Sequence, residues 1–90
     1  MPKVRFTPNL KRFYPTLQPT VIEAHTVAEL LSQVEVLHPG ICAYLIDEHG
    51  RLREHVNIFI GSELIHDKVK LSDPIGPQDE VYILQALSGG

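Results

Sequence analysis

The sequence lacks the features of a large or membrane-bound protein. Its 90 residues leave no room for a second domain. No apolar run approaches the roughly 20 residues that a transmembrane helix needs. The first five residues, MPKVR, also lack the apolar region of a secretory signal peptide. We therefore expect one small cytoplasmic domain that does not insert into a membrane.

Cysteine and positive charge are also scarce. The chain has one cysteine, Cys42, so no internal disulfide can form. The apolar residues around it indicate a small buried side chain rather than a reactive thiol. The formal net charge is -3, and binding to nucleic acid depends on a basic face that neutralises phosphates. We therefore expect no nucleic-acid partner.

The sequence holds no motif for catalysis or for metal binding. There is no P-loop, no nucleophilic triad, and no His or Cys spacing typical of a zinc site. The carboxylates in 47–48 and 79–80 lie in polar turns, where adjacent side chains point apart instead of pairing for acid–base work. We therefore expect no bound metal or cofactor, and a protein that is not itself an enzyme. The histidines, interpreted as scattered surface or boundary residues, are His25, His38, His49, His55 and His66.

The order of predicted strands and helices is regular. Alternating side chains predict strands over 3–7 and 55–60, a short β-branched apolar run predicts a strand over 20–24, and the last strand is expected over 81–84. The capping box of Thr26 and Glu29 opens a helix with an apolar stripe, which His38-Pro39-Gly40 ends. We expect a loop over 9–17 and a short turn or helix after Gly40 that packs against the core. A brief return strand is expected at 64–65.

This order predicts an α+β fold of the β-grasp type, in which a mixed sheet packs on one main helix. The first and last strands are expected to be central neighbours in the sheet. The β-grasp domain then spans residues 1–84, and a flexible C-terminal tail spans 85–90. The tail ends in two glycines, Gly89 and Gly90. Because glycine has no Cβ, such a tail can enter a narrow channel and present its carboxylate inside the active site of a partner.

Three segments of the sequence form recognisable motifs, VNIFIGSE at 56–63, QDEVYIL at 78–84 and ALSGG at 86–90. Together they resemble the MoaD/ThiS family of ubiquitin-like sulfur carriers. Family members share a valine–asparagine strand with a turn, an acidic turn before the last strand, and a tail of small residues ending in Gly-Gly. The strand at 56–58 looks most like the branch that delivers sulfur for cysteine synthesis. Many members carry proline or valine where this chain has QALS at 85–88, which leaves the receiving pathway open.

The resemblance implies that Gly90, preceded by Gly89, is the group acted upon. An E1-like adenylyltransferase would use ATP to adenylate the Gly90 carboxylate, and a sulfur donor would convert the adenylate to a thiocarboxylate. A sulfur-accepting synthase would then take the sulfur, and a JAMM-type metalloprotease is a further partner. Two alternatives stay open. The chain would act as a ubiquitin-like modifier joined to lysines through Gly90, or as the small subunit of a molybdopterin synthase.

The sequence also predicts where partners dock. Phe59 points away from the core in its strand, and Tyr82 and Leu84 do the same in the last strand. Together they are expected to form an apolar patch on the uncovered face of the sheet, extended by the loop at 12–14. The alternative is that segment 41–54 buries Phe59 or Leu84. The expected partner-binding residues are Phe59, Tyr82, Leu84, Leu87 and Ser88.

Overall fold

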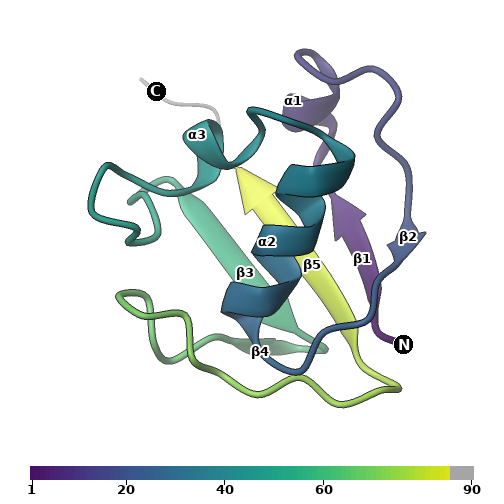
Figure 1. Cartoon of the computed structure of the whole chain (residues 1–90), viewed down its shortest axis with the longest axis vertical. Helices are drawn as coiled ribbons and strands as arrows, with labels where there is room; N and C mark the ends of the chain where they lie inside the picture. Colours follow the sequence, from purple (N-terminus) through teal and green to yellow (C-terminus); the bar gives the residue numbers. More distant parts are fainter. Residues whose placement is uncertain (86–90) are drawn as a thin grey trace.

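The computed structural model describes residues 1–85, which form a five-stranded mixed sheet with helices on one face (Figure 1). The strand order is β2-β1-β5-β3-β4. This arrangement confirms the predicted α+β fold of the β-grasp type. The elements are β1 (Lys3–Phe6), α1 (Pro8–Lys11), β2 (Thr20–Val21), α2 (Val27–Leu37), α3 (Cys42–Leu45), β3 (Val56–Ile60), β4 (Glu63–Leu64) and β5 (Glu80–Gln85).

The last strand occupies the centre of the sheet. β5 pairs in parallel with β1 and antiparallel with β3, which confirms that the first and last strands are neighbours. β2 extends the sheet beyond β1, and β4 extends it beyond β3, both antiparallel. β5 is one residue longer at each end than predicted, because Glu80 and Gln85 also pair with the neighbouring strands.

The main helix, α2, begins at the predicted cap. The Thr26 hydroxyl accepts a hydrogen bond from the Glu29 amide at 3.2 Å. The Glu29 carboxylate reaches back to the amide of His25 at 3.0 Å, one residue before the cap. The first bond satisfies an amide that the helix N-terminus leaves without a partner, and the second ties the Glu29 side chain to the residue before the cap. The buried residues of α2 follow the predicted stripe and are Val27, Leu30, Leu31 and Val34.

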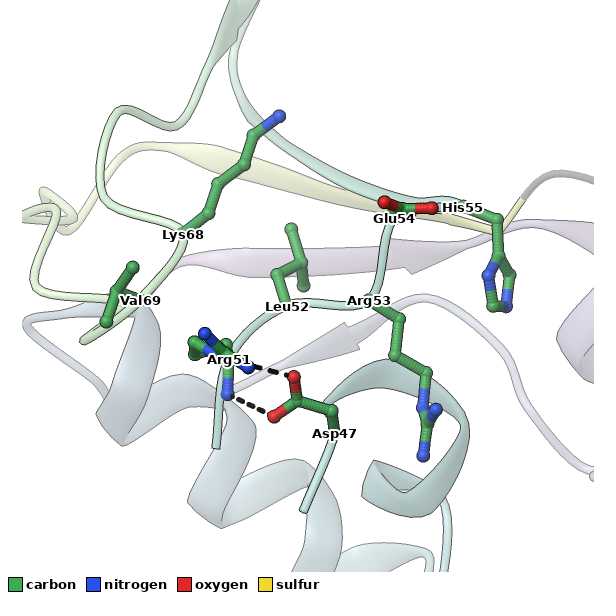
Figure 2. A pocket seen from close by; sticks show the side chains of 8 residues that line it. All are labelled: Asp47, Arg51, Leu52, Arg53, Glu54, His55, Lys68 and Val69. Carbon is green, nitrogen blue, oxygen red and sulfur yellow. Dashed lines mark hydrogen bonds and ion pairs between the residues drawn. The ribbon is translucent and has the colours of Figure 1, made fainter. Parts of the chain in front are cut away.

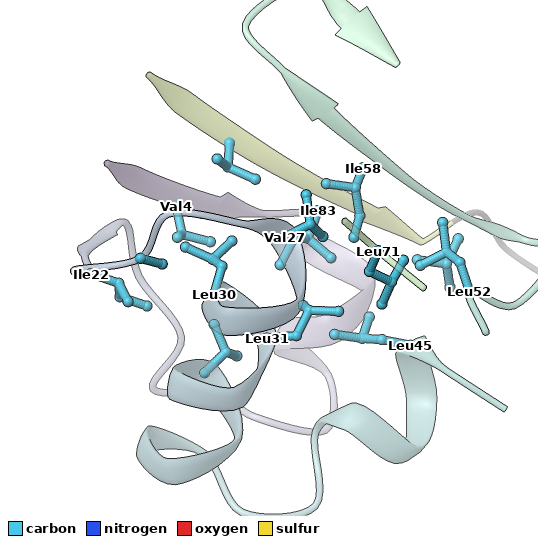
Figure 3. Packing of buried hydrophobic residues seen from close by; sticks show 14 of the residues in the cluster. Val4, Ile22, Val27, Leu30, Leu31, Leu45, Leu52, Ile58, Leu71 and Ile83 are labelled. Atoms are coloured by element: carbon cyan, nitrogen blue, oxygen red, sulfur yellow. The ribbon is translucent and has the colours of Figure 1, made fainter. Parts of the chain in front are cut away.

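The core lies between α2 and the covered face of the sheet (Figure 3). Ile58 and Ile83 from the central strands and Leu30 of α2 are fully buried members of this one cluster (Figure 3). Ile41 and Leu45 close the end of the core from the α3 segment, as predicted for the chain after Gly40. None of the side chains whose burial the structure describes is both polar or charged and buried, so hydrophobic packing positions the helices on the sheet.

Two predicted segments differ from the structure by more than a residue at an end. Part of the expected loop 9–17 is helical, because proline suits the first turn of a helix and Leu10 of α1 is fully buried against the core. The second strand pairs only at Thr20–Val21, not over 20–24. Ile22 remains buried, but its amide donates to the Pro2 carbonyl outside the sheet ladder.

No helix within residues 1–85 is long and apolar enough to cross a bilayer.

Candidate functional site

The predicted site at Gly89 and Gly90, with Leu87 and Ser88, lies outside the described residues. The structure does describe the base of that tail. The Gln85 amide donates to the Thr7 hydroxyl at 3.2 Å, and its side-chain amide donates to the Tyr44 carbonyl of α3 at 3.2 Å. Gln85 is thereby held from two sides, by the residue after β1 and by α3. We call this anchored residue the tail base.

The uncovered side of the sheet, which we call the open face, carries the three described residues predicted to bind partners. Phe59, Tyr82 and Leu84 are all half-buried. Phe59 pairs directly with Tyr82 on β5 and with Leu64 on β4. Paired residues in adjacent strands project to the same face, so these side chains form a row across the sheet. Leu64, which the sequence reasoning missed, is 38% exposed at the end of that row.

The row ends in an ion pair on the other side of Tyr82. Arg5 of β1 pairs with Tyr82 in the sheet, and its Nε lies 2.9 Å from the Glu80 carboxylate. The Tyr82 hydroxyl donates to the same Glu80 oxygen at 3.1 Å. These bonds, that from Arg5 first, lower the pKa of Glu80 and keep it charged. The open face therefore combines an apolar part and a fixed polar part, which fits a docking surface better than a catalytic site.

A hollow of about 330 Å³ adjoins this row. Leu84 and Tyr82 form its sheet side, while Pro8 and Pro19 approach from the chain that links β1 to β2. Lys11 at the end of α1 also lines it. The hollow was not predicted, because it depends on α1, which the sequence reasoning treated as a loop. It offers an apolar recess beside the tail base that could receive a side chain of a partner.

The loop at 12–14 does not extend the open face as predicted. The Phe13 ring stacks on Tyr44 of α3, with ring centroids 4.8 Å apart. The Tyr14 hydroxyl donates to the carbonyl of Pro39 after α2. These contacts hold both rings at the helix end of the molecule, away from Phe59. Aromatic packing against α3 explains the difference, because Tyr44 offers these rings a partner.

The other candidate groups lie apart from one another. Cys42 is half-buried, its thiol donates to the Leu31 carbonyl, and burial raises its pKa to about 11, so it is a poor nucleophile. Asp47 accepts hydrogen bonds from Arg51, and Asp79 accepts one from the Gly76 amide, as expected for carboxylates that stabilise turns. All five histidines are exposed or half-buried. No three His, Cys, Asp or Glu side chains within residues 1–85 are placed to hold a metal ion.

Comparison with known proteins gives a family and a set of structural relatives. Residues 9–90 match the ThiS family. A CysO from Amycolatopsis orientalis, solved in complex with BexX, is 25% identical, with a TM-score of 0.84 and all of both chains covered. CysO from Mycobacterium tuberculosis is also 25% identical, with a TM-score of 0.83 over 97% of this chain and 100% of that one. SAMP1 from Haloferax volcanii, at 19% identity, covers 99% of this chain and 98% of its own, with a TM-score of 0.77. No curated protein matches in sequence.

Proposed function

The chain belongs to the ThiS family, and on that premise we propose that it is a sulfur carrier that acts as a protein cosubstrate. In this proposal an E1-like adenylyltransferase uses ATP to activate the Gly90 carboxylate. The observation that carries the proposal is the family match, which extends through Gly90 at the end of a β-grasp domain. The CysO relatives, at 25% identity, support a place in cysteine synthesis.

The chemistry proposed for Gly90 follows from the low reactivity of a carboxylate. Attack of the carboxylate on ATP forms an acyl-adenylate and releases pyrophosphate. A sulfide from the sulfur donor then attacks the carbonyl carbon, a carbon–sulfur bond forms, and AMP leaves with the electrons of the carbon–oxygen bond. The product is a thiocarboxylate, from which a sulfur-accepting synthase takes the sulfur. ATP and the nucleophiles belong to the partners, and a JAMM-type metalloprotease is a further partner in this proposal.

The open face is the proposed docking surface for the activating enzyme. The apolar row of Phe59, Tyr82 and Leu64 gives contact area, and the hollow beside Leu84 gives a recess for an anchoring side chain. The pair of Arg5 and Glu80 fixes polar groups at one end of the row. The tail base lies directly beyond Leu84 in β5. An enzyme seated on this face is therefore close to the start of the tail.

Intact-mass measurement tests this function. The full chain is incubated with ATP, a sulfide source and an E1-like enzyme from the same source. We expect a mass gain equal to the replacement of one oxygen by sulfur. A variant that ends at Ser88 is the matched control and should gain nothing. If no E1-like enzyme from that source produces the gain on the intact chain, the proposal is wrong.

A second candidate function is conjugation to other proteins, because the same acyl-adenylate can be attacked by a lysine amine. The fold of the small archaeal modifier protein 1 of Haloferax volcanii matches this chain closely, which favours keeping this candidate. No lysine or arginine follows Lys70. Tryptic digestion of a conjugate would therefore leave a branched peptide that carries residues 71–90. Such peptides on lysines of other proteins would support a modifier function.

A further inference from the structure

A second hollow, of about 550 Å³, lies away from the row of Phe59 and Tyr82. It is formed where the segment before β3 approaches the turn at 68–69, and the Leu52 amide joins the two by donating to the Lys68 carbonyl at 2.8 Å. Figure 2 shows Lys68 and Val69 on one side and Arg53, Glu54 and His55 on the other. We call it the basic groove. Its lining residues are Asp47, Arg51, Leu52, Arg53, Glu54, His55, Lys68 and Val69.

One pair of charges in the basic groove is already neutralised. The Arg51 Nε lies 3.3 Å from the Asp47 carboxylate, and the Arg51 amide donates to the same group at 3.0 Å (Figure 2). These bonds, the backbone one first, contribute to lowering the pKa of Asp47. The carboxylate is thus charged and occupied by Arg51. It does not compensate the other cations of the groove.

Arg53 and Lys68 remain without a carboxylate partner within residues 1–85. The Arg53 Nε donates to the Ala43 carbonyl at 3.1 Å, which holds its side chain toward α3 and leaves its charge uncompensated. Lys68 is exposed, and half-buried His55 adds a third nitrogen group. Glu54 is the one carboxylate that opposes them in the groove. With Arg51 paired to Asp47, the groove keeps two cations, Arg53 and Lys68, against one carboxylate, Glu54.

The apolar residues of the groove help to distinguish between two kinds of ligand, a small anion and a peptide segment. Leu52 is 9% exposed between the cations, and Val69 is 59% exposed on the rim. A small inorganic anion would leave Val69 in water. An acidic peptide segment with an apolar side chain would pair with the cations and cover Val69 as well. The mixed lining therefore favours a protein segment over a small anion.

The position of the groove adds a second argument. Val56 pairs with Gln85 in the sheet, so the segment that ends at His55 runs up to the tail base. The adjacent carbonyls of Ala43 and Tyr44 in α3 accept hydrogen bonds from Arg53 and from Gln85, respectively. The groove and the tail base are thus fastened to the same helix. A single protein bound at the tail would therefore also be close enough to contact the groove.

We propose that the basic groove docks an acidic, partly apolar segment of the protein that receives the tail. The identity of that protein as an activating enzyme rests on the proposed function above. The charge and shape of the groove do not rest on it. Long-range attraction between such surfaces mainly speeds association and weakens as salt screens the charges.

The first test uses a peptide and needs no enzyme. A short synthetic peptide of glutamates around one leucine is titrated into the labelled full chain and followed by NMR. We expect amide shifts confined to residues 51–55 and 68–69, which shrink as salt rises. The variant Arg53→Glu/Lys68→Glu should lose them, whereas Arg12→Glu/Lys70→Glu, with the same change in net charge, should keep them. Absence of shifts, or equal shifts with inorganic phosphate, would overturn the proposal.

The second test uses the activating enzyme. Arg53→Glu/Lys68→Glu should raise the KM for the carrier by about tenfold, with kcat unchanged, and the difference should grow as salt falls. The control variant should match the wild type. If the wild type is activated and the groove variant has the same KM, the docking inference fails while the function stands. If the wild type is never activated, the function fails, and the peptide titration alone decides the inference.

Discussion

The two faces of the sheet differ in a way that separates folding from recognition. Ile58 and Phe59 are neighbours on β3, yet Ile58 is fully buried under α2 and Phe59 is half-buried on the open face. β5 repeats the contrast, with Ile83 fully buried and Tyr82 half-buried. In the part of the chain that the structure describes, no charged side chain is buried in the core, while the open face holds the pair of Arg5 and Glu80. One strand thus serves the core with alternate residues and leaves the others for a partner.

The largest expected effect is a difference in stability between a substitution on the covered face and one on the open face. Ile58→Ala should lower the free energy of unfolding by about 2–5 kcal/mol, because it leaves a cavity under α2. Phe59→Ala should cost clearly less, because its ring is already partly in water. Urea unfolding followed by circular dichroism measures both. Equal losses from the two variants would show that the open face is also part of the core.

The second prediction concerns access to the helix side. The pKa of the Cys42 thiol is raised to about 11 from an ordinary 9.0, chiefly by burial. Since only the thiolate reacts, the native thiol should be alkylated roughly a hundredfold more slowly than in the urea-unfolded chain at mildly alkaline pH. The rate of iodoacetamide labelling followed by mass spectrometry checks this. Similar rates in the two states would mean that the covered side opens readily.

The third prediction concerns recognition. Phe59→Ala and Tyr82→Ala should each raise the KM of the activating enzyme for the carrier by about tenfold, because each removes contact area at the centre of the row. Val36→Ala is the matched control. Val36 is apolar and 73% exposed, but it lies on α2 on the other side of the sheet. If Val36→Ala raised the KM as much as Phe59→Ala, the enzyme would not dock specifically on the open face.

The smallest expected effect concerns the ion pair of the open face. Because Glu80 has a lowered pKa in the folded state, its contribution to stability is present above the unfolded pKa of about 4.3 and is lost as pH falls through the folded value. Glu80→Gln should remove this part of the pH dependence and lower the melting temperature only slightly, since the two side chains are 42% and 45% exposed and water weakens the pair. Melting curves between neutral and acid pH compare the two proteins. An unchanged acid limb in the variant would mean that the pair does not contribute.

Local signals in the sequence were sufficient to predict the main helix and to predict which strand side chains face the core. The cap at Thr26 and the stripe that includes Leu30 depend on residues within a few positions of one another, and both were predicted. α1 was missed because its helical form depends on the burial of Leu10 against distant elements. A loop over 9–17 was expected there instead. The length of β2 was overestimated for a related reason, since Ile22 is buried without joining the ladder.

The candidate site was harder to predict, because it depends on register between distant strands. Alternation indicated that Phe59 and Tyr82 face away from the core, but not that they pair with each other. Arg5 and Glu80 lie 75 residues apart, and no local pattern connects them. The approach of Lys68 to the segment before β3 also comes from loop packing rather than periodicity. These contacts required the folded chain.

The two hydrogen bonds that hold Gln85 set a limit on how far Gly90 can reach into the active site of a partner. Thr7 and Tyr44 fix the position of Gln85. Gly90 is five residues further along the sequence, and an extended chain of that length spans at most about 18 Å. A partner docked on the surface of the domain can therefore react with Gly90 only if its reacting atoms lie within that distance of the tail base. Deleting or inserting one residue between Gln85 and Gly90 would change the maximum distance between them by about 3.5 Å. Activity of such variants with the partner would measure how deep its active site lies.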